Sequence, residues 1–302
     1  MAERVILRLA YKRVEPKGEV SVERKGLFGE ESWRITEYNV ALDSLIVQRP
    51  EGPDAYRYEG QSITIAPQPH KQFCRWHSGP LWERDEPWKR LYCVVESDSY
   101  CRQHKRSLRA LYELCLSSNS EKTLPVCKKV DEAGRTNYTV YLTDAGAGRV
   151  KVGVTRSFRL LERLAEQAHN VATPLYTTDS IYEARRMELT ISRKKLASQV
   201  KARRPVRVPL AEAASKLSST AERIARELGI SWEGRLIRVA SPVSGYIFHS
   251  KPSKAPALEG VMVSIMGYWG GYIVAENDGR VYVVSTRDLV HRDSIIIPGL
   301  NP

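Results

Sequence analysis

Hydrophobic and polar positions alternate in short runs over the first part of the chain, and this alternation predicts β-strands. Leu45–Val47 and Ser62–Ile65 are two such runs, and Gly, Pro and Asp residues separate them from their neighbours. Between Leu108 and Cys115 the apolar positions recur at helical spacing instead. We therefore expect a small β segment over residues 1–72, followed by a cysteine-rich stretch that leads into a helix.

The middle of the chain predicts two strands that share a polar face. The first strand, Thr139–Thr143, places Tyr141 and both threonines on one face, and the return strand, Val150–Thr155, alternates in the same way. Lys151 and Gly153 then lie on the same face as Tyr141. A glycine has no side chain, so a bulky ligand could approach the backbone there.

Helices and further strands follow this pair. Ser180 and Glu183 form a capping box, which predicts that a helix begins there. An Ala-rich stretch from Pro209 to Leu228 predicts a second helix, with Gly229 as its C-cap. After this helix the chain alternates again, and Asn277-Asp278-Gly279 predicts a hairpin turn.

Together these elements predict an α+β fold with a central α/β sandwich that contains a small antiparallel sheet. A β segment and a zinc module precede the sandwich, and a β domain follows it. The expected divisions are an N-terminal β segment (1–72), a zinc-binding module with a helix (73–136), the central domain (137–207), a linking helix (208–229) and a C-terminal β domain (230–302).

The composition is that of a folded globular protein. Hydrophobic residues make up 42% and charged residues 27% of the 302 positions, which excludes a wholly disordered chain. The longest uncharged apolar window, Gly260–Ala275, is too short and too rich in glycine to span a membrane. Charged residues break the first apolar run at the N-terminus, so a secretory signal is not expected. These features predict a cytoplasmic protein without a membrane partner.

The net charge of +12 is concentrated in one segment. Between Arg149 and Arg207 there are 14 Lys or Arg and 5 Asp or Glu, whereas the rest of the chain is nearly balanced. A basic segment favours nucleic acid, DNA or RNA, as the partner, and a solvated basic surface is the alternative. The residues expected to bind nucleic acid are Arg156, Arg193, Lys194, Lys195, Lys201, Arg203, Arg204 and Arg207.

Two Cys-x2-His pairs predict a structural zinc site. Cys74 and His77 form the first pair, and Cys101 and His104 form the second, with 23 residues between them. Two residues between ligands allow a tight turn to direct both side chains at one ion, and four such ligands complete the tetrahedron that structural zinc prefers. The chance coincidence of buried thiols and histidines is the alternative.

The remaining cysteines leave the ligand set open. Five cysteines are an odd number, which in a cytoplasmic chain argues against paired disulfides and favours metal ligands or reduced thiols. Either Cys93 or Cys115 could replace a histidine as a metal ligand. Cys127 is expected to be a core or surface thiol.

Glu188 falls near the centre of the apolar arc of the helix that follows Ser180. Burial of an unpaired carboxylate is costly, so Glu188 needs a cationic partner. That partner is either a metal ion or an arginine, for example Arg159 or Arg163. From the sequence, Glu188 can belong either to a structural ion pair or to a functional site.

The order of these residues resembles the GIY-YIG nuclease domain over roughly residues 138–200. The resemblance rests on Val140-Tyr141-Leu142, then Lys151-Val152-Gly153, an arginine-bearing helix and a later glutamate. Lys151 stands where the second motif has a tyrosine. The whole chain also resembles an uncharacterised archaeal and bacterial family that joins a Cys-rich metal site to a GIY-YIG-like core and a C-terminal β segment.

The resemblance implies roles for particular residues. Tyr141 would help to activate the nucleophile, Arg159 or Arg163 would stabilise the phosphoryl transition state, and Glu188 would hold Mg²⁺ or Mn²⁺. The set of candidate catalytic residues is therefore Tyr141, Lys151, Arg159, Arg163 and Glu188.

Three hypotheses of function follow. The first is a nucleic-acid-binding protein with a GIY-YIG-like domain that acts as a divalent-metal-dependent phosphodiester endonuclease. The second is a non-catalytic, zinc-containing DNA- or RNA-binding factor, which the lysine in place of the second tyrosine favours. The third is a protein-interaction scaffold built on the two β segments. Salt-dependent binding and metal-dependent cleavage distinguish the three.

Overall fold

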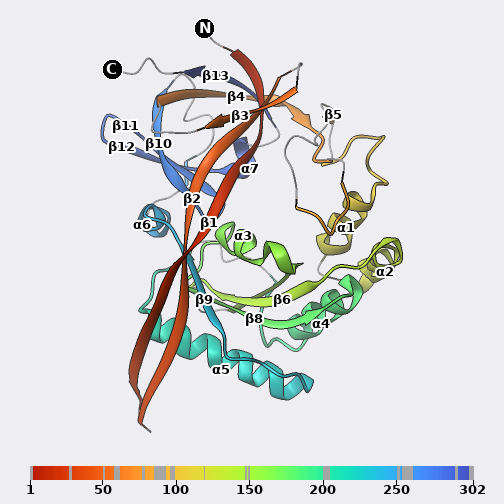
Figure 1. Ribbon diagram of the computed structural model, residues 1–302, viewed down its shortest axis with the longest axis vertical. Coiled ribbons are helices and arrows are strands. Elements are labelled where there is room, and N and C mark those ends of the chain that lie inside the picture. The colour runs from red at the N-terminus through yellow and green to blue at the C-terminus, as the bar shows by residue number, and fades with distance from the viewer. Residues whose placement is uncertain are drawn as a thin grey trace. The chain divides into compact units, whose positions relative to one another are not determined.

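The computed structural model divides the chain into two compact units (Figure 1). Unit 1 comprises Met1–Arg13, Val40–Ala110 and Ser241–Pro302, and unit 2 comprises Val14–Asn39 and Leu111–Ala240. The residues described are 3–26, 29–49, 52–57, 62–76, 79–84, 93–95, 99–118, 120–146, 148, 150–199, 205–249, 252–253, 261–289 and 292–298.

Unit 1 is built mainly from antiparallel strands, paired in the order β12-β11-β10-β4-β13-β1. Strands β1 and β2 each contribute to both units, β3 pairs with β2, and the short strand β5 pairs with the end of β4. Apolar side chains of β10, β11 and β12 are buried and form much of the core of this unit. The elements are β1 (Glu3–Gly26), β2 (Gly29–Arg49), β3 (Gly52–Arg57), β4 (Ser62–Phe73), β5 (Val94–Val95), α6 (Ser244–His249), β10 (Met262–Trp269), β11 (Tyr272–Asn277), β12 (Arg280–Ser285), α7 (Thr286–Leu289) and β13 (Arg292–Pro298).

Unit 2 contains a mixed sheet in the order β2-β9-β8-β6-β7, and helices pack against it. Strand β2 is parallel to β9, and the other neighbours are antiparallel. Helix α4 packs against β6, β7 and β8, and helix α5 packs against β6 and β8. The elements are α1 (Leu108–Ser117), η2 (Glu121–Thr123), α2 (Leu124–Ala133), β6 (Tyr138–Asp144), β7 (Val150–Arg156), η3 (Ser157–Arg159), α3 (Leu160–Ala165), β8 (Val171–Thr178), α4 (Ile181–Arg193), α5 (Leu210–Leu228) and β9 (Leu236–Ala240).

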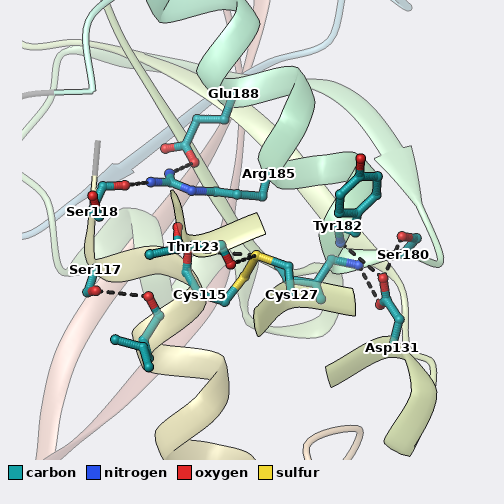
Figure 2. Close-up of a disulfide and its surroundings, with 12 residues drawn as sticks. Cys115, Ser117, Ser118, Thr123, Cys127, Asp131, Ser180, Tyr182, Arg185 and Glu188 are labelled. Atoms are coloured by element: carbon teal, nitrogen blue, oxygen red, sulfur yellow. Dashed lines mark hydrogen bonds and ion pairs between the residues drawn. A yellow bond between two sulfur atoms is a disulfide. The ribbon is translucent and has the colours of Figure 1, made fainter. Parts of the chain in front are cut away.

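The predicted helix boundaries in unit 2 are confirmed. The hydroxyl of Ser180 accepts a hydrogen bond from the backbone N–H of Glu183 at the start of α4, as its cap position requires. Asp131 of α2 adds to this cap by accepting from the backbone N–H groups of Ile181 and Tyr182, as Figure 2 shows. Helix α5 ends at Gly229 in the left-handed conformation. Among the described helices, none has the length and apolar character needed to cross a membrane.

Several predictions about the strands hold and others do not. The turn at Asp278 and Gly279 joins β11 to β12, with both residues at positive φ, as predicted. The N-terminal strands are much longer than the short runs predicted, because Pro16 and Gly18 lie inside β1 and do not end it. The prediction that a ligand could approach the polar face of the Tyr141 hairpin is wrong for β6. Every residue of β6 is buried, so both faces of that strand are covered.

The prediction that all cysteines are unpaired is also wrong. Cys115 of α1 and Cys127 of α2 form a disulfide that joins the two helices (Figure 2). Cys115 therefore cannot replace a histidine as a metal ligand, and Cys127 is not a free thiol. The odd number of cysteines could not reveal this disulfide, since Cys74, Cys93 and Cys101 lie outside it.

Candidate functional site

Tyr141 lies at the centre of a buried hydrogen-bonded chain in unit 2. The side-chain amide of Gln167 donates to the phenol oxygen of Tyr141 at 2.6 Å, and the ammonium group of Lys151 donates to the amide oxygen of Gln167 at 2.7 Å. Gln167 follows helix α3 and is buried. Two of the predicted residues are thus connected through a third that no sequence pattern indicated.

Gly153 has a role that differs from the one predicted. It is paired with Tyr141 across β6 and β7, and a Cβ atom built on it would lie 2.7 Å from the phenol oxygen. The space above this glycine is therefore occupied by the ring of Tyr141 and not by a ligand. Glycine is needed here because any side chain would displace the buried tyrosine.

The two candidate catalytic arginines are paired with glutamates near them in sequence. Arg163 lies 2.8 Å from a carboxylate oxygen of Glu166, and Arg159 lies 3.3 Å from both Glu162 and Glu166. Arg163 also acts on Tyr141: burial raises the pKa of the phenol, and the charge of Arg163 opposes that shift. Of the two alternatives, Arg163 is therefore the one joined to the Tyr141 cluster.

Glu188 is buried and its carboxylate pairs with Arg185, one turn earlier in α4 (Figure 2). The same guanidinium donates to the backbone carbonyl of Ser118. The sequence correctly predicted a buried carboxylate with a cationic partner. The suggested partners, Arg159 and Arg163, are wrong as ion-pair partners, because each pairs with a glutamate of its own region.

Four of the predicted catalytic residues influence one another electrostatically. Burial raises the pKa of Glu188, and the charges of Arg185 and Lys151 oppose that shift. Burial likewise raises the pKa of Tyr141, with Glu188 adding to the shift and Arg163 opposing it. Tyr141, Lys151, Arg163 and Glu188 are therefore close enough to influence one another, and the tyrosine remains a neutral phenol at neutral pH.

The residues predicted to bind nucleic acid fall into three groups. Arg193, Lys194, Lys195 and Arg207 are exposed. Arg156 is buried between the rings of Tyr112 and Phe158, so a phosphate backbone cannot reach it in this structure. The remaining three, Lys201, Arg203 and Arg204, lie outside the described residues.

A second cluster lies in unit 1, where three potential metal ligands converge. The sulfur atoms of Cys74 and Cys101 and a ring nitrogen of His104 lie within 4.8 Å of one another. The Nδ1 atom of His104 is 3.1 Å from the Cys101 sulfur, 3.8 Å from that of Cys74 and 3.6 Å from that of Cys93. The predicted ligand His77 lies outside the described residues.

The surroundings of this cluster hold its side chains in position. The ring of Trp76 stacks on His104 at a centroid distance of 4.2 Å, and the Cys74 sulfur accepts hydrogen bonds from the backbone N–H groups of Trp76 and Cys101. Burial raises the pKa of Cys74 and lowers that of His104. Burial also acts to raise the pKa of Cys101, but backbone amides outweigh it, so that pKa lies below the ordinary value.

The fold and the sites define an α+β protein with a Cys/Cys/His cluster that could hold a metal ion. Comparison of the sequence with known families gives a match over residues 82–290 to the family described as protein of unknown function (DUF2797). The match covers more than two thirds of the chain, and the protein belongs to this family. Comparisons with curated proteins and with solved structures found no match.

The close contact between Gly153 and Tyr141 can be tested with an added methyl group. We expect Gly153→Ala to lower the free energy of unfolding by about 1–3 kcal/mol, because the new Cβ displaces a fully buried ring. Gly245→Ala is the matched control, since nothing lies within 4 Å of its added Cβ. Urea unfolding of both variants measures the effect. Equal stability of the two variants would contradict the packing described.

Proposed function

We propose that this chain is a nucleic-acid-binding protein whose residues 138–200 form a GIY-YIG-like domain in which the motif residues serve structure. The exposed run Arg193-Lys194-Lys195 at the end of α4 carries the binding proposal. Arg193 pairs with Glu121 and Lys194 with Glu227, but both pairs are exposed and therefore weak. Phosphate groups can therefore replace the glutamates as partners of these cations at little cost in free energy.

Removing two of these charges should weaken binding to nucleic acid. For Arg193→Ala with Lys194→Ala, we expect weaker binding of labelled DNA or RNA of any sequence, and a slope of log K against log salt that is flatter by about two for duplex DNA. Arg280→Ala with Arg287→Ala removes the same charge from exposed positions of unit 1 and serves as the control. Fluorescence anisotropy at several salt concentrations measures both. If the two double variants bind alike, the proposed surface is wrong.

A second candidate function is metal-dependent endonuclease activity. It is favoured by the convergence of Tyr141, Lys151, Arg163 and Glu188, which are the positions that the family resemblance assigns to catalysis. In that case Glu188 would hold Mg²⁺ or Mn²⁺, which would stabilise charge on the phosphoryl group. Against it, Tyr141 is closed from solvent and the Glu188 carboxylate is already paired with Arg185. Binding of a cation would have to break that pair.

Replacement of Glu188 distinguishes the two functions. We expect Glu188→Gln to lower the free energy of unfolding by about 3 kcal/mol, because the buried Arg185 guanidinium loses its counter-charge. Glu222→Gln, at an exposed position of helix α5, should change it by about 0.5 kcal/mol or less. Calorimetry and a cleavage assay with labelled DNA and RNA, with and without Mg²⁺ or Mn²⁺, test this. Cleavage by the parent that Glu188→Gln abolishes without loss of stability would establish the endonuclease instead.

We propose zinc as the metal of the unit 1 cluster, with Cys93 as the fourth ligand beside Cys74, Cys101 and His104. With bond lengths of about 2.3 Å to sulfur and 2.0–2.1 Å to nitrogen, a tetrahedral zinc ion places sulfur and nitrogen ligands about 3.6 Å apart. The three sulfur distances to His104 Nδ1, 3.1, 3.6 and 3.8 Å, lie around that value. A Cys₃His set fills four positions, so the metal would be structural.

The ligand set predicts different outcomes for two single substitutions. Cys93→Ala should lose zinc to a chelator far more readily than the parent and should lower the melting temperature, because metal binding contributes to folding. His77→Ala should keep about one zinc per chain. Elemental analysis after purification and chelator competition provide the readout. Loss of zinc from His77→Ala with retention by Cys93→Ala would restore His77 as the ligand, and a parent that binds no added zinc would refute the metal.

A further inference from the structure

A pocket of about 670 Å³ lies in unit 2, and its lining differs from the clusters described above. One wall is helix α5, which contributes Lys216, Thr220 and Arg223 at helical spacing. The segment from the last turn of α4 to Ser198 and the start of β7 provide the rest. The volume is that of a site for a small organic molecule.

The lining of this pocket is positively charged. Among its described residues, Lys195, Lys216 and Arg223 are cationic and none is acidic. The Lys216 ammonium pairs with buried Asp144 at 3.1 Å, which offsets one of the three charges. Arg223 donates to the neutral backbone oxygen of Leu196. The charges of Arg223 and Lys195 therefore remain to attract an anion.

The other lining groups fit the rest of a nucleotide. Ser192 carries a hydroxyl group that can donate to a phosphate or sugar oxygen. The Thr220 hydroxyl donates to the backbone oxygen of Lys216 and can accept from a sugar hydroxyl, and Val150, Leu196 and Ala197 provide apolar surface. A lone inorganic anion would fill only a small part of this volume. We propose that this pocket binds a nucleotide, with its phosphate group held by Lys195 and Arg223. This pocket is distinct from the buried Tyr141 cluster. The proposal also goes beyond the nucleic-acid-binding surface proposed above, because a free nucleotide fits the pocket as well as a nucleotide within a strand.

The test compares two arginines of the same helix. Arg223 lines the pocket, whereas Arg226, which is three residues further along α5 and also exposed, is not among the lining residues. Calorimetric titration uses adenosine monophosphate, with adenosine as the probe that lacks the phosphate group. We expect saturable binding of the monophosphate only, weakened at least tenfold by Arg223→Gln and unchanged by Arg226→Gln. Lys195→Gln combined with Arg223→Gln should abolish it.

Two further measurements show whether the pocket binds a free nucleotide or a nucleotide within a strand, and they distinguish this proposal from the proposed nucleic-acid-binding surface. If a short single-stranded oligonucleotide also binds with the same dependence on Arg223, the occupant is a nucleotide within a strand, and otherwise it is a free nucleotide. Arg193→Ala with Lys194→Ala should weaken strand binding but leave the binding of adenosine monophosphate intact. No saturable binding of the monophosphate to the parent, or equal weakening by Arg223→Gln and Arg226→Gln, would overturn the pocket assignment.

Discussion

The charge of Glu188 has to be neutralised inside unit 2, and the structure does this with Arg185. Glu188 is 6% exposed and Arg185 is 2% exposed, so neither charge can rely on water. The same arginine donates to the backbone oxygen of Ser118, close to the disulfide between Cys115 and Cys127 (Figure 2). Helix α4 is thus joined to the preceding segment by the hydrogen bond from Arg185 and, at its N-terminus, by Asp131, whereas the ion pair lies within the helix and neutralises the arginine that makes this contact. Removing the glutamate would disturb this whole region.

This constraint limits what the neighbouring residues can do. A carboxylate held by a guanidinium binds a cation only by giving up that contact, and a buried tyrosine with a raised pKa is a poor base at neutral pH. The ring of Tyr141 packs over Gly153, and its phenol oxygen accepts a hydrogen bond from Gln167. Both contacts fix the phenol in place. This favours the proposal that Tyr141, Lys151, Arg163 and Glu188 serve structure, and that ligands bind at the exposed cations and the basic pocket instead.

Local patterns predicted much of the fold, because they depend on neighbouring residues. The helix starts and stops at Ser180 and Gly229 and the turn at Gly279 required only capping and turn chemistry. The length of β1 could not be predicted, since the strand continues through Pro16 and Gly18 and lies in the sheet between β13 and β2, which local turn signals do not reveal.

The site could be predicted only in part. Periodicity indicated that Glu188 is buried, but not that Arg185 points toward it. The odd number of cysteines led to the wrong prediction that none forms a disulfide, because a count cannot tell which thiols meet in space. The approach of Cys93 to His104 depends on the pairing of β4 with β5, which is a tertiary feature. Gln167 lies outside any motif, and only the tertiary structure places it between Lys151 and Tyr141.

The most direct test of the proposed role of Glu188 is titration of Mn²⁺ into the zinc-loaded protein, followed by electron paramagnetic resonance. If Arg185 holds the carboxylate, the protein binds no Mn²⁺ at the Tyr141 cluster, and the titration curves of the parent and Glu188→Gln coincide. One tightly bound Mn²⁺ per chain that is absent in folded Glu188→Gln would contradict this account and place a metal ion where the structure has an ion pair.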